Sequence, residues 1–185
     1  MTRGERPVLR RAVAALICGL GLTHAAQAQE TRLIEDALAA AAQTFGQVSG
    51  ALGDTSMGVP TSEYRNALTR LRFASSVWGE TLAVQISVAE NGRGLCAGFA
   101  AYVTPAITQG AVVLTICPQF FSAGADALRE TTILHEMVHV VAGTDECRAM
   151  AYTAQVQSLA SGSYVPVRDY WAKNGCEGSR YKLPH

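Results

Sequence analysis

The stretch TILHEMVHVVAGTDE, residues 132–146, constrains the fold of this chain more than any other. His135 and His139 stand four residues apart, so on a helix they lie on one face, about one turn from each other, and can direct ring nitrogens at a single ion. Gly143 can take the left-handed conformation that ends a helix, and Thr144 can cap the next one. The segment therefore predicts two consecutive helices with a metal site where they meet.

The residue after the first histidine, Glu136, lies about 100° further round such a helix, beside the metal without being a ligand. From there it can take a proton from a water activated by the metal and pass it to a leaving amine, which is the chemistry of peptide hydrolysis. The alternative is a chance HExxH on a buried helix, because the neighbouring residues are apolar on more than one side: Ile133, Leu134, Met137, Val138, Val140 and Val141. Two histidines and a glutamate are costly to bury in apolar surroundings unless they have a partner. A divalent cation would be a partner for all three, so we favour a zinc site.

A catalytic zinc usually has three protein ligands and keeps a fourth position for water. The remaining histidine of the exported chain, His185, is its last residue, and termini are often frayed. A carboxylate is therefore the expected third ligand, and Asp145 and Glu146 follow the histidine pair directly. Either of them can instead merely complement the dipole of the next helix. We expect one to bind the metal and the other to play this lesser part.

Residues 1–28 have the pattern of a secretory signal peptide, with arginines, then the apolar run AVAALICGLGL, then a small-x-small triplet ending at Ala28. The run is about half the length that a permanent membrane span needs. A lipid anchor on Cys18 is disfavoured, because Ile17 before it is not the small residue that such processing sites prefer. We therefore expect cleavage after Ala28 and a single metallopeptidase-like domain, residues 29–185, that is secreted or periplasmic.

Loss of the signal removes four arginines and one glutamate, which leaves 11 basic and 14 acidic side chains and a net charge of −3. No basic field remains for nucleic acid, and no membrane partner is expected once the signal is gone.

Four cysteines remain in the exported chain, Cys96, Cys117, Cys147 and Cys176, an even number in an oxidising compartment. Two disulfides are expected, and the favoured pairing joins Cys96 to Cys117 and Cys147 to Cys176. Each bond closes a loop of roughly 20 to 30 residues and contributes about 3 kcal/mol. A four-cysteine zinc site is the alternative, but the chain has no C-x-x-C pair to support it.

Hydrophobic periodicity predicts an α+β fold with a helical N-terminal half, a small antiparallel sheet, and an active-site helix followed by a second helix. A loop rich in Gly, Ser and Pro separates the first two helices, and the C-terminal tail is expected to be mostly loops pinned by Cys176. The expected helices are residues 31–48, 61–78, 125–142 and 145–159, and the expected strands are 81–88, 98–104 and 111–116.

HEMVH followed closely by GTDE resembles the HExxH plus GTxD signature of the aspzincin metallopeptidases, the group containing deuterolysin and peptidyl-Lys metalloendopeptidase. The upstream stretch CAGFAAYVTPAITQGAVVLTICPQFF is similar to the family's cysteine-bracketed strand pair, and the resemblance covers roughly residues 95–160. It implies a zincin-like fold and a secreted zinc endopeptidase, expected as a monomer, acting on protein or peptide substrates. His135 and His139 would be zinc ligands, Glu136 the general base, and Glu146 the third ligand.

Two positions depart from the family pattern. The family has aspartate where this chain has Glu146, and Asp145 stands just before it; glutamate is one methylene longer and can still reach the ion, so we prefer Glu146 over Asp145. The family's tyrosine, three residues after the ligand, is Ala149 here, and a missing oxyanion donor costs on the order of 10²-fold in rate. Tyr152, one turn further on, is the candidate donor, and the other candidates are Tyr164 and Arg148. The alternative function is a non-catalytic zinc-binding or disulfide-stapled exported binding protein.

Overall fold

The computed structural model describes residues 8–185 of the chain, with side chains from residue 25 onward. The chain divides into two compact units, Met1–Glu35 and Asp36–His185. The predicted signal peptide lies partly outside the described residues and stays a prediction. Helix α1 (Val8–Val48) begins well before residue 31, where the helix was expected to start. The reason is that the Ala- and Leu-rich run before residue 31 also favours a helix strongly. No helix in the described part of the chain combines the length and apolar character that crossing a membrane requires.

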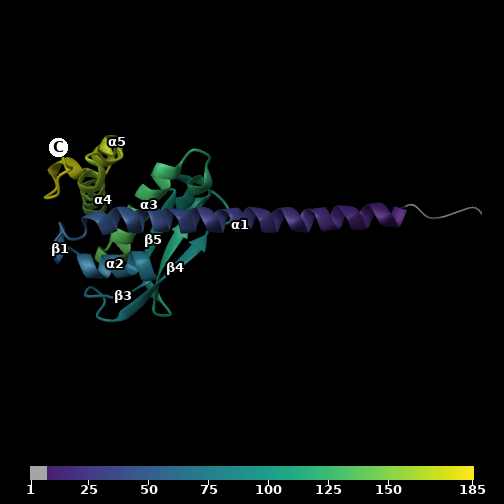
Figure 1. The fold of residues 1–185 in the computed structure, drawn as a ribbon, viewed down its shortest axis with the longest axis horizontal. Helices are drawn as coiled ribbons and strands as arrows, with labels where there is room; N and C mark the ends of the chain where they lie inside the picture. The colour runs from purple at the N-terminus through teal and green to yellow at the C-terminus, as the bar shows by residue number, and fades with distance from the viewer. Residues whose placement is uncertain (1–7) are drawn as a thin grey trace, which may run out of the picture. The chain divides into compact units, whose positions relative to one another are not determined.

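The α+β class expected from the sequence is confirmed, and Figure 1 shows the elements in chain order by colour. After α1 come a two-stranded ribbon, a helix, the strands of a four-stranded sheet, two consecutive helices and a short C-terminal helix. Their bounds are β1 (Thr55–Ser56), β2 (Val59–Pro60), α2 (Thr61–Arg70), β3 (Arg72–Ala74), β4 (Thr81–Val88), β5 (Ala101–Thr108), β6 (Ala111–Ile116), α3 (Asp126–Ala142), α4 (Glu146–Ser161) and α5 (Arg168–Lys173).

The larger sheet has the strand order β3-β4-β6-β5 and is mixed. β5 and β6 form an antiparallel hairpin, as expected, but β4 pairs with β6 in parallel, from Ala83 opposite Ala111 to Val88 opposite Ile116. The connection after β4 leaves a space beside that strand before β5 begins, and β6 then fills this space. β6 therefore lies between β4 and β5 and runs parallel to β4. As a result β5 is an edge strand, paired within the described residues to β6 alone.

The second helix is shorter than expected. α2 ends at Arg70, where Leu71 takes a left-handed conformation with φ of 49°, and the predicted continuation to Trp78 was wrong. The chain forms β3 instead, with Phe73 opposite Leu82 of β4, and both side chains are buried. Burial of these two side chains against the rest of the sheet outweighs the local helical pattern.

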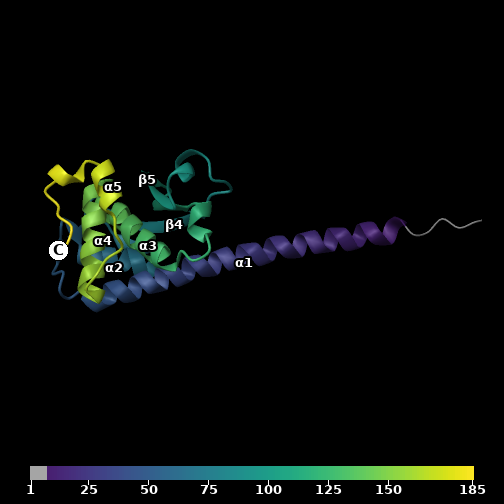
Figure 2. The same cartoon turned by 90° about the horizontal axis from the view of Figure 1, so that it is seen from above.

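The helix that carries the HEMVH motif, α3, runs through the centre of the larger unit. It packs against α4, α2 and β5, and Figure 2 shows α3 and α4 side by side. The backbone carbonyl of Leu134, just before the first motif histidine, accepts a hydrogen bond of 2.7 Å from the buried hydroxyl of Tyr64. Tyr64 is itself held between the rings of Phe45 and Tyr152, at centroid distances of 4.8 and 5.1 Å. The motif thus stands on a rigid, buried helix.

Both predicted disulfides are confirmed. Cys96 bonds to Cys117, which ties the short 3-10 turn η1 (Gly94–Ala97) to the end of β6. Cys147 bonds to Cys176, which ties the first turn of α4 to the segment after α5. The C-terminal tail, expected to be mostly loops, also contains the helix α5 and is pinned through Cys176 as predicted.

Candidate metal centre

The centre lies where α3 ends and α4 begins. Gly143 follows α3 with a positive φ of 86°, a conformation that favours glycine, and lets the chain turn back beside His139. The cap of α4 is Asp145 and not Thr144 as expected: the Asp145 carboxylate accepts a hydrogen bond of 3.0 Å from the backbone N–H of Arg148. Glu146 is then the first residue of α4 and faces the histidines.

Three side chains converge there. The Nε2 atoms of His135 and His139 are 3.0 Å apart, and the Glu146 carboxylate lies 3.2 Å from the first and 3.5 Å from the second. One ligand atom from each of the three falls within 4.8 Å of the others, so this group can hold a metal ion. The Asp145 carboxylate, the other acidic candidate, is instead engaged at the helix cap.

The ring of His139 is oriented by the turn that follows it. Its Nδ1 lies 3.0 Å from the carbonyl oxygen of Gly143. A carbonyl only accepts, so Nδ1 carries the proton and donates it, and in the neutral ring Nε2 presents a lone pair to the centre. Metal-binding histidines commonly have this kind of supporting hydrogen bond, which fixes the tautomer and the ring plane.

The charges around the centre also favour a cation. Burial raises the pKa of Glu146, but the neighbouring rings of His135 and His139, when protonated, outweigh burial and hold that pKa well below its usual range. Burial lowers the pKa of His135, so its ring is readily neutral. For His139, burial again lowers the pKa, but the interactions with Glu146, Glu136 and the Gly143 carbonyl raise it overall. An ionised carboxylate facing two imidazoles is a donor set suited to a divalent metal.

Glu136 is buried beside this group without joining it. Its Oε2 has no hydrogen-bond partner among the described residues, and burial raises the pKa of Glu136 to about 8. The backbone of Val103 in β5 and the ring of His139 act in the opposite direction and favour the carboxylate. A buried carboxyl oxygen with a free lone pair, next to a metal-binding group, is placed to take up a proton.

A cavity of about 180 Å³ opens onto the centre, and it brings in a residue that the sequence analysis missed. The phenol of Tyr170, on α5, lines this cavity and lies 3.4 Å from Glu146 Oε2. Burial raises the pKa of Tyr170 to about 12, with the charge of Glu146 adding to the effect, so the phenol keeps its proton. The expected bond between Cys147 and Cys176 was the available signal, because it links the residue after Glu146 to the tail that carries Tyr170.

None of the three oxyanion donors considered from the sequence lines this cavity. Tyr152 is fully buried and packed on Tyr64, and its hydroxyl has no hydrogen-bond partner within the described chain. Tyr164 bonds to the carbonyl of Pro184. Arg148 is occupied by the hydroxyl of Tyr181 and the backbone at the end of α3.

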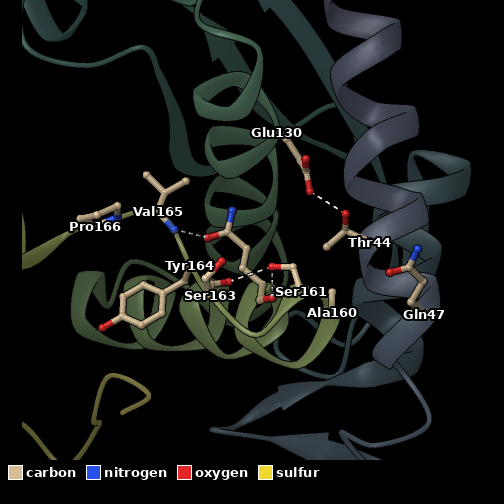
Figure 3. A pocket seen from close by; sticks show the side chains of 10 residues that line it. Thr44, Gln47, Glu130, Ala160, Ser161, Ser163, Tyr164, Val165 and Pro166 are labelled. Atoms are coloured by element: carbon tan, nitrogen blue, oxygen red, sulfur yellow. Dashed lines mark hydrogen bonds between the residues drawn. The ribbon is translucent and has the colours of Figure 1, made fainter.

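A larger cavity, of about 440 Å³, lies elsewhere, between α1, α3 and the segment after α4 (Figure 3). Its acidic residue, Glu130, accepts a hydrogen bond from Thr44, and Gln157 holds the backbone of Val165. No histidine lines this larger cavity. Among the described residues, the side chains that can bind a metal therefore lie at the smaller cavity.

Comparisons of the chain with protein-family models, with curated proteins and with solved structures found no match.

Proposed function

We propose that this chain is a secreted or periplasmic zinc-dependent endopeptidase of the aspzincin type, with a zincin-like fold. The observation that carries the proposal is the convergence of His135, His139 and Glu146 within 4.8 Å, beside a buried carboxyl oxygen of Glu136 that has no hydrogen-bond partner in the described part of the chain. Two histidines and a glutamate are a ligand set of catalytic zinc sites, which keep one position for water or substrate. The two disulfides support export, because such bonds persist in oxidising compartments.

His135, His139 and Glu146 would hold the zinc ion, with the His139 ring fixed by Gly143. When bound, zinc supplies Lewis acidity, which polarises a substrate carbonyl and lowers the pKa of water from about 16 towards 7. Glu136 accepts the proton that the attacking water loses, and it delivers this proton to the amine nitrogen as the C–N bond breaks. Burial raises the pKa of Glu136, which strengthens its carboxylate as a proton acceptor.

Tyr170 would donate a hydrogen bond to the carbonyl oxygen of the substrate as negative charge develops there. Its phenol lines the cavity, keeps its proton and lies beside a ligand carboxylate. Tyr170 would take the place of the tyrosine that the family has at position 149, where this chain has Ala149. The lack of that tyrosine was the reason to consider a non-catalytic zinc-binding module. A phenol contributed by α5 therefore favours the enzyme over that alternative.

A peptide is the substrate class that the open edge of β5 suits. The N–H of Cys117 bonds to the carbonyl of Ala100, and the alternation of an antiparallel pair then turns the backbone groups of Ala101 and Val103 away from β6. Both residues line the cavity, where the backbone of Val103 also interacts with the Glu136 carboxylate. An extended peptide can pair with such an edge through its main chain, whatever its side chains. Pro105 lacks an N–H, so this pairing would stop in the middle of β5.

The decisive test compares Glu136→Gln with Glu130→Gln, the same change on the same helix at a position outside the centre. We expect the zinc-loaded Glu136→Gln protein to keep one zinc per chain, by elemental analysis, and to hydrolyse denatured protein at least about 10²-fold more slowly. Glu130→Gln should keep both zinc and activity. A Glu136→Gln protein as active as wild type would overturn the mechanism, and a zinc-loaded wild type without turnover would favour the binding module.

A further inference from the structure

Arg148, in the first turn of α4, is half-buried and has no carboxylate at ion-pair distance in the described part of the chain. Its guanidinium is held by neutral oxygens instead. Nη1 donates to the backbone carbonyl of Ala142, the last residue of α3, and Nε donates at 2.9 Å to the hydroxyl of Tyr181 in the C-terminal tail. The positive charge also meets the negative end of the α3 dipole. Arg148 therefore links the end of α3, the start of α4 and the tail.

The carbonyl that Arg148 binds belongs to the turn that orients His139. The peptide group between Ala142 and Gly143 is held at both ends. Its N–H donates to the carbonyl of His139 at 3.1 Å, and its oxygen accepts from Arg148. The next carbonyl, that of Gly143, lies 3.0 Å from Nδ1 of His139. Arg148 thus fixes the peptide plane directly before the one that sets the tautomer and the orientation of the histidine ring.

Gly143 makes such a bond necessary. Its φ of 86° is a conformation that glycine can enter and leave readily, because it has no Cβ. A Cβ at this position would meet no heavy atom within 4 Å beyond the adjacent residues, so packing does not hold the turn either. The hydrogen bonds of the turn therefore keep its conformation. If the bond from Arg148 is lost, the peptide group can rotate and the Gly143 carbonyl moves away from His139. The same rotation displaces Glu146, which lies three residues further on.

We propose that Arg148 is a positioning residue of the metal centre. It acts through the peptide group between Ala142 and Gly143 and contacts neither the metal nor the substrate. Through that group it keeps the ring of His139 and the carboxylate of Glu146 in the arrangement that binds an ion. This inference rests on the metal centre of the proposed function and does not require peptidase activity. Residues that support metal ligands in this way change metal affinity about 10- to 100-fold when they are replaced.

The test compares Arg148→Met with Arg180→Met. Both guanidiniums donate to the hydroxyl of Tyr181, at 2.9 and 2.7 Å, but within the described chain only that of Arg148 also bonds to the turn. In competition with a chromophoric chelator, Arg148→Met should have a dissociation constant for zinc at least about 10-fold higher than wild type. Arg180→Met should stay within about twofold of wild type. Arg148→Lys keeps the charge but lacks the planar fork that reaches both oxygens, so its dissociation constant should lie between those of wild type and Arg148→Met.

A second readout uses the metal-free protein. The chemical shifts of the ring nitrogens of His139, measured by NMR where the ring is neutral, report which nitrogen carries the proton. We expect Nδ1 in wild type and in Arg180→Met, and a mixture of the two tautomers in Arg148→Met. An arginine that only stabilises the fold would lower the urea midpoint and leave both the tautomer and the zinc affinity as in wild type, and this result would overturn the inference.

Two further outcomes are decided by the same readouts. If Arg148→Met does not fold, Arg148→Lys is compared with Arg180→Lys, and equal zinc affinity and equal tautomers in the two would again overturn the inference. A wild type that binds no zinc would overturn the proposed function, and the tautomer of His139 would then decide the role of Arg148.

Discussion

Removal of the Glu146 carboxylate should weaken zinc binding strongly while the fold survives. The carboxylate oxygens contact His135 and His139, at 3.2 and 3.5 Å, and the phenol of Tyr170. The side chain is 35% exposed, so Glu146→Ala leaves no deep cavity. Four-ligand zinc sites bind with about 10–16 kcal/mol, or roughly 3–4 kcal/mol per ligand. Loss of one ligand of three should therefore raise the dissociation constant for zinc about 10²- to 10³-fold.

The assay is competition for zinc against a chromophoric chelator of known affinity, at fixed pH, for wild type, Glu146→Ala and Asp145→Ala. Asp145→Ala removes the cap of α4 and should lower the free energy of unfolding by about 1 kcal/mol while zinc affinity changes little. The two variants thus separate ligation from capping. If Asp145→Ala loses zinc and Glu146→Ala keeps it, the assignment of the third ligand is refuted.

Four further outcomes are expected. Tyr170→Phe should lower kcat about 10- to 10²-fold with KM and zinc content nearly unchanged, whereas Tyr164→Phe should leave kcat intact; equal kcat in both variants would remove the phenol from the mechanism. Tyr64→Phe should lower the free energy of unfolding in urea by about 1 kcal/mol, because the buried bond to the α3 backbone is lost. Replacing Cys147 and Cys176 with serine should cost about 3 kcal/mol in the same measurement. Free zinc at 100 times its dissociation constant should stabilise the fold by about 2.7 kcal/mol, and a thermal midpoint that a strong chelator leaves unmoved would argue against a bound metal.

The elements that the sequence predicted well are those fixed by local patterns. The helix that carries HEMVH was expected over residues 125–142 and spans Asp126–Ala142, because its apolar residues recur at helical spacing and Gly143 stops it. Its successor, expected over 145–159, spans Glu146–Ser161 for the same reason. The disulfide pairing followed from loop length alone, because the bonds with short loops cost the chain least to close.

The elements that were missed depend on distant partners. Nothing local distinguishes residues 72–74 from more helix; they become β3 because Phe73 pairs with Leu82 and is buried there. The parallel pairing of β4 with β6 is likewise invisible locally, since it depends on where the long connection returns. Tyr170 was not predicted as part of the site for a similar reason. Its helix, α5, lies far along the chain from Glu146, and the two residues come together only in the folded protein.

The choice between the two acidic residues shows how a one-residue shift in a helix start decides chemistry. Had Thr144 capped α4, Asp145 and Glu146 would both have stood on its first turn, with either free to face the histidines. With Asp145 as the cap, its Oδ1 accepts the N–H of Arg148, which holds the carboxylate at the end of the helix and outside the group of His135, His139 and Glu146. Glu146, the first residue inside the helix, has no capping role. Its side chain is long enough to come within 3.5 Å of both histidines. The longer residue is thus the one that fits a centre built on this cap, and an aspartate at position 146 would need α4 to lie closer to α3.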